Sequence, residues 1–193
     1  MKLKALNAGI AALLLSTGAH ADWALDNEAS SFYYVTSKAS MVSEVNTFSG
    51  LSGGIAADGT ATLEIDLATV NTAIEVRDER MREIVFEVEE YPEASVSVKV
   101  DAAALDAMAP GTSSTAAHTA TVNLHATSAE FPTELQIIKL DADTILVQLT
   151  KPLLVNASSF GLTDAVEELR SIASLPSINP QVVVDFTLVY NKQ

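Results

Sequence analysis

The segment Ala61-Thr62-Leu63-Glu64-Ile65-Asp66-Leu67 carries an apolar side chain at every second position. Successive side chains of a β-strand point to opposite faces, so this period of two places the apolar side chains on one face and the polar ones on the other. The segment therefore predicts a strand with one dry face and one hydrated face. Asp58-Gly59, separated from it by Thr60 alone, is typical of a tight hairpin turn.

Other segments with the same alternation, or with comparable strand character, follow one another along the chain. They are residues 31–38, 42–55, 94–101, 121–125, 134–140, 145–150 and 182–188. The sequence thus predicts an all-β protein of about eight successive, mostly antiparallel strands. Such strands must either close into a barrel or fold into a sandwich, and the pattern alone leaves both open. The segment from Ala102 to Ala120 is dominated by Ala, Ser and Thr, and we expect it to be a long hairpin connection.

Two segments lack the period of two and predict short helices. Val76 to Val88 interleaves charged and apolar side chains in a way that suits an amphipathic helix. Thr163 to Ala173 is the second, because Thr163 can cap a helix whose first turn is acidic, and Pro176 ends it.

The N-terminus has the features of a cleaved secretory signal. Lys2 and Lys4 are followed by an apolar run from Ala5 to Leu15 and by Ala19-His20-Ala21, the small-x-small form that a signal peptidase recognises. The alternative, a retained membrane anchor, needs about 20 apolar residues, and this run is shorter. We therefore expect residues 1–21 to be a signal peptide, residues 22–193 to be one domain, and the mature protein to be periplasmic.

Composition excludes several classes of function. The formal net charge is −14, and removal of the two signal lysines makes it more negative. Such a surface repels nucleic acid and anionic lipid headgroups. The chain has no Cys and three His, which leaves little for a transition-metal site. No nucleophile elbow, phosphate-binding loop or convincing carboxylate pair occurs, and no later segment reaches transmembrane length. We predict no catalytic or metal-binding residue, no required cofactor and no stable membrane insertion.

The middle of the chain resembles the YceI-like family. The residues that carry this resemblance are Asn71 to Arg82, with Arg77-Asp78 at its centre, then Phe86 and Tyr91-Pro92. Weaker similarities extend it over nearly all of residues 22–190, and they lie at Trp23-Ala24-Leu25-Asp26, Ser30, Phe32, Phe48-Ser49-Gly50, Phe160-Gly161-Leu162 and the segment from Val182 to Tyr190.

The resemblance implies an extended, lipocalin-like, eight-stranded antiparallel barrel with an apolar tunnel. It also implies an exported protein that binds polyisoprenoid chains, such as prenyl quinones, or comparable long lipids. Ala29 and Arg80 stand where the family often has His, so the resemblance does not specify the ligand's headgroup.

Twelve apolar residues are predicted to face the interior of such a barrel. They form the wall of a ligand tunnel or, alternatively, a filled core, and the abundance of Val and Ala favours the tunnel. The twelve are Phe32, Phe48, Leu63, Ile65, Val96, Val98, Val122, Leu124, Val147, Leu149, Val184 and Phe186.

Three charged residues, Arg77, Asp78 and Arg80, are candidates for contact with the polar end or rim of the ligand. The two arginines would favour an anionic or carbonyl-bearing headgroup. The alternative is structural: the Arg77–Asp78 pair would hold the helix against the barrel rim.

Two hypotheses of function follow. In the first, the protein is a periplasmic carrier that holds a polyisoprenoid, a ubiquinone-type molecule or a fatty chain inside the barrel. In the second, it is a stress or adhesion factor, or a partner of a membrane redox protein, that acts through its surface, for example the acidic stretch Glu87 to Glu90. A homodimer is compatible with either hypothesis.

Overall fold

The computed structural model describes residues 21–39 and 41–193. The predicted signal peptide, residues 1–21, lies outside the described residues except for Ala21, where the first strand begins. Eight antiparallel strands form a closed ring in the order β1-β3-β4-β6-β7-β8-β9-β11. Their bounds are β1 Ala21–Lys38, β3 Leu51–Ala56, β4 Thr60–Asp66, β6 Glu93–Lys99, β7 Ser113–Leu124, β8 Thr127–Lys139, β9 Thr144–Leu149 and β11 Gln181–Lys192.

The first and last strands of the chain close this ring. β1 pairs antiparallel with β11 from Trp23 opposite Lys192 to Val35 opposite Val183. The backbone groups at both edges of the sheet are thereby paired, which a sandwich would not achieve. The predicted all-β, eight-stranded antiparallel barrel is confirmed.

The closing pair contains a bulge that Asp26 and Ser30 organise. The Asp26 carboxylate accepts hydrogen bonds from the backbone N–H groups of Glu28 and Ala29, both at 3.1 Å. Ser30 Oγ donates to the Asp26 carbonyl and accepts from the N–H of Val189 on β11. The pairing register between β1 and β11 shifts at this point. These two side chains therefore keep the two strands joined across an irregularity in their ladder.

Three further strands lengthen the barrel at one end. They are β2 (Val42–Phe48), β5 (Val70–Asn71) and β10 (Leu153–Asn156). β2 pairs with the second half of β1 and with β5, and β10 pairs with the first half of β11. The prediction of one strand over residues 42–55 was wrong, because the chain bends between Phe48 and Leu51. Each half of that segment pairs with a different part of β1.

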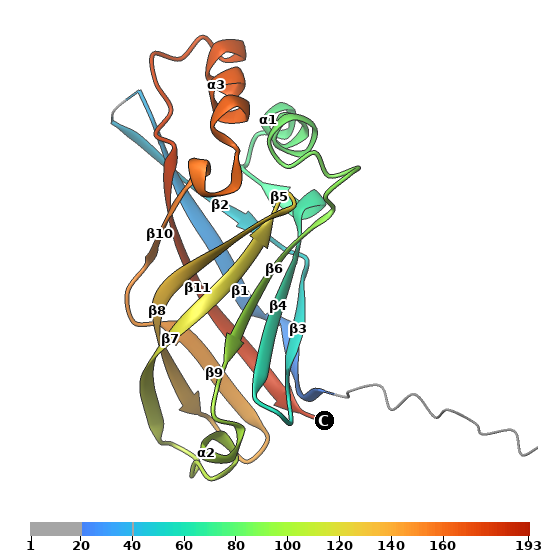
Figure 1. Cartoon of the computed structure of the whole chain (residues 1–193), viewed down its shortest axis with the longest axis vertical. Helices are drawn as coiled ribbons and strands as arrows, with labels where there is room; N and C mark the ends of the chain where they lie inside the picture. Colours follow the sequence, from blue (N-terminus) through green and yellow to red (C-terminus); the bar gives the residue numbers. More distant parts are fainter. Residues whose placement is uncertain (1–20, 40) are drawn as a thin grey trace, which may run out of the picture.

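The predicted helices are present, although Thr163 is the first residue of its helix and not a side-chain cap, and the chain also contains others. α1 (Glu75–Arg80) continues into one π-helical stretch, η2 (Met81–Val85), and α3 spans Thr163–Ile172. Figure 1 shows α1 and α3 together at the extended end of the barrel. Two short 3₁₀ segments, η1 (Leu67–Thr69) and η3 (Ala157–Phe160), join strands to their neighbours.

The expected hairpin connection over residues 102–120 was wrong in two respects. Its first part is a helix, α2 (Ala102–Asp106), which the Asp101 side chain caps by accepting a hydrogen bond from the N–H of Ala104. Its last part is β7, which begins at Ser113. The side chains of residues 113–117 are all exposed, so the sequence shows no alternation of apolar and polar residues there. This part of β7 is defined only by its pairing with β8. α2 lies at the end of the barrel opposite α1 and α3 (Figure 1).

Candidate ligand-binding site

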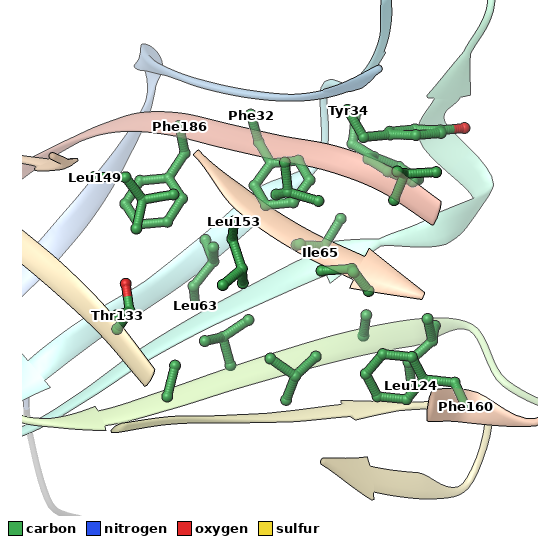
Figure 2. Close-up of a pocket in the computed structure, with 18 of the residues that line it drawn as sticks. Phe32, Tyr34, Leu63, Ile65, Leu124, Thr133, Leu149, Leu153, Phe160 and Phe186 are labelled. Atoms are coloured by element: carbon green, nitrogen blue, oxygen red, sulfur yellow. The ribbon is translucent and has the colours of Figure 1, made fainter. Parts of the chain in front are cut away.

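The barrel encloses an elongated apolar cavity of about 280 Å³, part of whose wall is shown in Figure 2. All twelve residues predicted to face inward line this cavity. They come from six strands of the ring, β1, β4, β6, β7, β9 and β11, and from β2, because alternation brings every second side chain of a strand to the interior. The interior is therefore hollow rather than completely filled.

The cavity follows β11 over most of its length. Val182, Val184, Phe186, Leu188 and Tyr190, five alternate residues of this strand, all line it. At roughly 3.3 Å per residue these positions span about 26 Å along the strand. The shape of the cavity therefore suits a long, narrow molecule.

The helical end of the cavity is covered by side chains that the sequence pattern did not predict to belong to a site. Met81 and Val85 come from η2, and Leu162, Val166 and Leu169 come from α3 and the residue before it. The spacing of Leu162, Val166 and Leu169 could have identified an apolar helix face. The sequence did not show that this face covers a cavity instead of packing on a solid core.

Aromatic side chains gather in the part of the cavity beside β1. The rings of Phe32 and Phe186 stack with centroids 6.5 Å apart, and Phe48 packs edge-on against Phe32 at 6.0 Å. The Tyr34 ring stacks on Phe48 at 5.6 Å. These rings give this part of the cavity flat apolar surfaces.

A few polar side chains interrupt the apolar wall, and two of them have unsatisfied hydroxyl groups. Among the described residues, the buried oxygens Tyr34 Oη and Thr133 Oγ1 have no hydrogen-bond partner. Burial raises the pKa of the Tyr34 hydroxyl well above its usual value of 10; the nearby charge of Arg77 opposes this shift and that of Asp78 adds to it. Tyr34 is therefore a neutral hydroxyl across the physiological pH range.

Arg77, Asp78 and Arg80 do not line the cavity. Arg77 Nη1 donates to Glu44 Oε2 at 2.6 Å, and its Nη2 donates to the Thr72 carbonyl. Asp78 Oδ1 accepts hydrogen bonds from Thr72 as well. Arg77 and Asp78 thus join α1 to β2 and to the residue after β5, as the structural alternative for this pair expects. Arg80 is half-buried on the same helix.

Glu44 connects this cluster to β1. Its carboxylate also forms an ion pair with Lys38 Nζ at 2.7 Å. The hydrogen bond from Lys38, together with that from Arg77, holds the pKa of Glu44 below its usual value of 4.5, against the opposing effect of burial. Lys38, Glu44 and Arg77 are thus joined by ion pairs, and Asp78 shares Thr72 with Arg77, so the cluster has two positive and two negative side chains.

The opposite end of the barrel is closed by Trp23 and Lys139, which are 2% and 4% exposed. Lys139 Nζ lies 4.1 Å from the centroid of the Trp23 ring, within the range of a cation–π interaction. Neither residue lines the cavity. Lys139 continues the inward-facing positions of β8, and its charge kept it from being recognised as an interior residue.

The two histidines among the described residues lie away from the cavity. His118 Nδ1 is 3.0 Å from the carbonyl oxygen of Lys99. His125 Nε2 forms a hydrogen bond with Glu87 Oε2, and its ring packs on the Tyr91 ring with the centroids 4.3 Å apart. In the described part of the chain, no helix has the length and apolar character needed to cross a membrane.

Comparisons with solved structures and with a family model agree with this architecture. No curated protein matches the chain. Among solved structures, the chain is similar to a polyisoprenoid binding domain from Saccharophagus degradans implicated in plant cell wall breakdown. That domain is 41% identical with a TM-score of 0.89, and the match covers 90% of this chain and 100% of that one.

Two more distant structures share the fold. BcnA of Burkholderia cenocepacia is 19% identical with a TM-score of 0.66, over 86% of this chain and 98% of that one. A YCEI protein of Campylobacter jejuni is 16% identical with a TM-score of 0.54, over 77% of this chain and 84% of that one. The family model of the YceI-like domain matches residues 23–190. The chain therefore belongs to the YceI-like domain family.

Proposed function

We propose that this protein is an exported carrier that holds one long apolar ligand, such as a polyisoprenoid, a prenyl quinone or a fatty chain, inside its barrel. The observation that carries the proposal is the elongated apolar cavity lined by all twelve predicted residues. The Saccharophagus degradans domain, 41% identical over its whole length, is described as binding polyisoprenoid, which supports the same class of ligand here.

The energetics of such a site are simple. Each buried CH₂ group contributes roughly 0.8 kcal/mol, so a chain of several isoprene units gains enough to bind without any required cofactor or special polar contact. The same reasoning makes the choice of tail permissive. We propose binding and transport rather than catalysis, with the ligand kept from water until it is delivered.

The first experiment is native mass spectrometry of the protein purified from the periplasm, followed by solvent extraction of whatever it releases. A stoichiometric long-chain adduct is the expected result, and its mass names the class of cargo. A mass of the protein alone, with no uptake after incubation with a prenyl quinone, a prenyl alcohol or a fatty acid, would overturn the proposal. The same mass tests export, because cleavage after Ala21 leaves Asp22 as the first residue.

A matched pair of variants locates the ligand. Val147→Trp places a large ring in the cavity, whereas Val45→Trp makes the same change on the surface, where Val45 is 62% exposed. We expect Val147→Trp to reduce ligand occupancy at least about tenfold and Val45→Trp to leave it unchanged. If the larger ring prevents folding, Val96→Phe on another part of the wall gives a smaller obstruction. Equal occupancy in the folded cavity variant and in Val45→Trp would argue against an interior site.

A further inference from the structure

Three buried polar side-chain atoms have no hydrogen-bond partner in the part of the chain that the structure describes: Tyr34 Oη, Arg77 Nε and Thr133 Oγ1. Native proteins leave few such atoms unsatisfied, because each has lost its contact with water and gained nothing in return. An unsatisfied group in the wall of a binding cavity therefore indicates where a polar atom of the ligand is expected.

Two of the three atoms belong to residues that lie near each other. Tyr34 lines the cavity from β1 and is only 7% exposed. The charges of Arg77 and Asp78 on α1 both act on its hydroxyl. In Figure 2 the Tyr34 hydroxyl points away from Leu149 and Thr133, toward the other end of the view. Tyr34 thus places an O–H group at the part of the cavity wall beside α1, whereas Arg77 does not line the cavity itself.

The charges around these two groups determine which ligand atom suits them. Glu44 forms ion pairs with Arg77 at 2.6 Å and with Lys38 at 2.7 Å. Asp78 supplies a second negative charge, so the two positive and two negative side chains balance. No positive charge of this cluster remains to neutralise a buried anion, and an unpaired buried charge is costly. An uncharged oxygen, in contrast, can accept a hydrogen bond from the Tyr34 hydroxyl without that penalty.

We propose that the Tyr34 hydroxyl binds the polar end of the ligand, and that this site, beside the balanced charges of Arg77 and Asp78, selects an uncharged carbonyl or hydroxyl oxygen over a diphosphate or a carboxylate. The tail then extends along β11 toward the end closed by Trp23 and Lys139. This inference rests on the proposed function, since a site for the head requires a tail in the cavity.

The test uses Tyr34→Phe, which removes one hydroxyl and keeps the ring that stacks on Phe48. Four probes share an isoprenoid tail: a prenyl quinone, a prenyl alcohol, a prenyl diphosphate and squalene, which has no oxygen. We expect the native protein to bind the quinone or the alcohol at least about tenfold more tightly than the diphosphate. Tyr34→Phe should weaken binding of that preferred neutral probe by about 3- to 10-fold, the range of one hydrogen bond, and leave squalene unchanged.

Thr133→Val is the matched control, because it removes the other unsatisfied hydroxyl of the same cavity with little change of shape. We expect it to leave the preference among the probes unchanged. Loss of the preference in Thr133→Val but not in Tyr34→Phe would overturn the assignment to Tyr34. Tighter binding of the diphosphate by the native protein would overturn the selectivity.

The outcomes also separate this inference from the function on which it rests. If squalene and the quinone bind but Tyr34→Phe, folded with a native melting temperature, binds both as the native protein does, the head site is wrong and the carrier function stands. If none of the four probes binds the native protein, the carrier function itself fails.

Discussion

Asp78 accepts two hydrogen bonds from Thr72 through one oxygen, Oδ1: one from the backbone N–H at 2.7 Å and one from the hydroxyl at 2.5 Å. Arg77 donates to the carbonyl oxygen of the same threonine. The residue before α1, Ile74, provides no side-chain cap. Thr72 is 5% exposed and directly follows β5, so these bonds attach the helix to the extended end of the barrel in place of a cap.

Asp78→Ala should therefore destabilise the protein. The substitution leaves the buried N–H and hydroxyl of Thr72 without their charged acceptor, and hydrogen bonds to charged groups contribute about 1.5–3 kcal/mol each. Because the two bonds share one oxygen, we expect a total loss of about 2–4 kcal/mol in the free energy of unfolding, measured by urea denaturation. Glu79→Ala, on an exposed position of the same helix, is the control and should change stability by less than about 0.5 kcal/mol.

The ion pairs of Glu44 predict a dependence of stability on pH. Its pKa is lower in the folded protein than its usual value of 4.5, so the folded state favours the charged carboxylate. The stabilisation is present above pH 4.5 and is lost as the pH falls through the lowered pKa. We expect the native protein to be more stable than Glu44→Gln at neutral pH, and the difference to shrink below pH 4.5. Thermal melts of both proteins across this range measure it.

Glu89→Gln controls for the change in net charge alone, because Glu89 is exposed and outside this cluster. A stability difference between native protein and Glu44→Gln that stays constant down to the lowest pH would show that the ion pairs with Lys38 and Arg77 do not stabilise the fold.

Alternation predicted the strands and their inward-facing side chains because both depend on the same local rule, whereas closure into a barrel was indicated only by the family resemblance. Val96 and Val98 on β6, for example, face inward simply because they are two residues apart on a strand, and both line the cavity. The exposed start of β7 has no dry face, so its pairing with β8 could not be recognised. The break near Ser49-Gly50 depends on which partner each half of the segment finds, which is a long-range property.

Polar residues of the site were harder to place than apolar ones. Arg77 was conspicuous in the sequence, but only its contacts with Glu44 and Thr72 show where its hydrogen-bonding groups are used. Tyr34 lies among strand residues with no feature that marks an unsatisfied hydroxyl. Whether a polar group is satisfied depends on atoms from distant segments, which local patterns do not reveal.

Two glycines with left-handed backbone provide a further test. Gly59 has a φ of 82° and Gly111 a φ of 81°. A Cβ atom at Gly59 would lie 2.1 Å from the Val100 carbonyl oxygen, whereas one at Gly111 meets nothing within 4 Å. Gly111→Ala should cost only the conformational penalty, about 1–2 kcal/mol. Gly59→Ala adds a backbone clash and should cost at least about 3 kcal/mol in chemical denaturation. Equal losses would show that the turn can move away from Val100.

The end of the barrel closed by Trp23 can be followed directly, because Trp23 is the only tryptophan of the chain. Lys139→Ala removes the nearer of the two cations over its ring, since Lys192 Nζ lies 5.4 Å from the centroid, and also the apolar stem that shields it. Cation–π contacts contribute up to about 2 kcal/mol when desolvated, and loss of packing adds to this. We therefore expect the free energy of unfolding to fall by about 2–4 kcal/mol. We also expect a red shift of the Trp23 fluorescence, because water reaches the ring.

Lys139→Met separates the charge from the stem. Methionine keeps most of the apolar length of the lysine side chain. It removes the cation–π attraction of Lys139 but also the cost of burying its charge. The loss in the free energy of unfolding should therefore be less than half that of Lys139→Ala. Lys151→Ala, on the exposed turn after β9, should leave emission and stability unchanged. If Lys139→Ala behaves like Lys151→Ala, the lysine does not close this end of the barrel. If Lys139→Met is as damaging as Lys139→Ala, the charge rather than the stem protects Trp23.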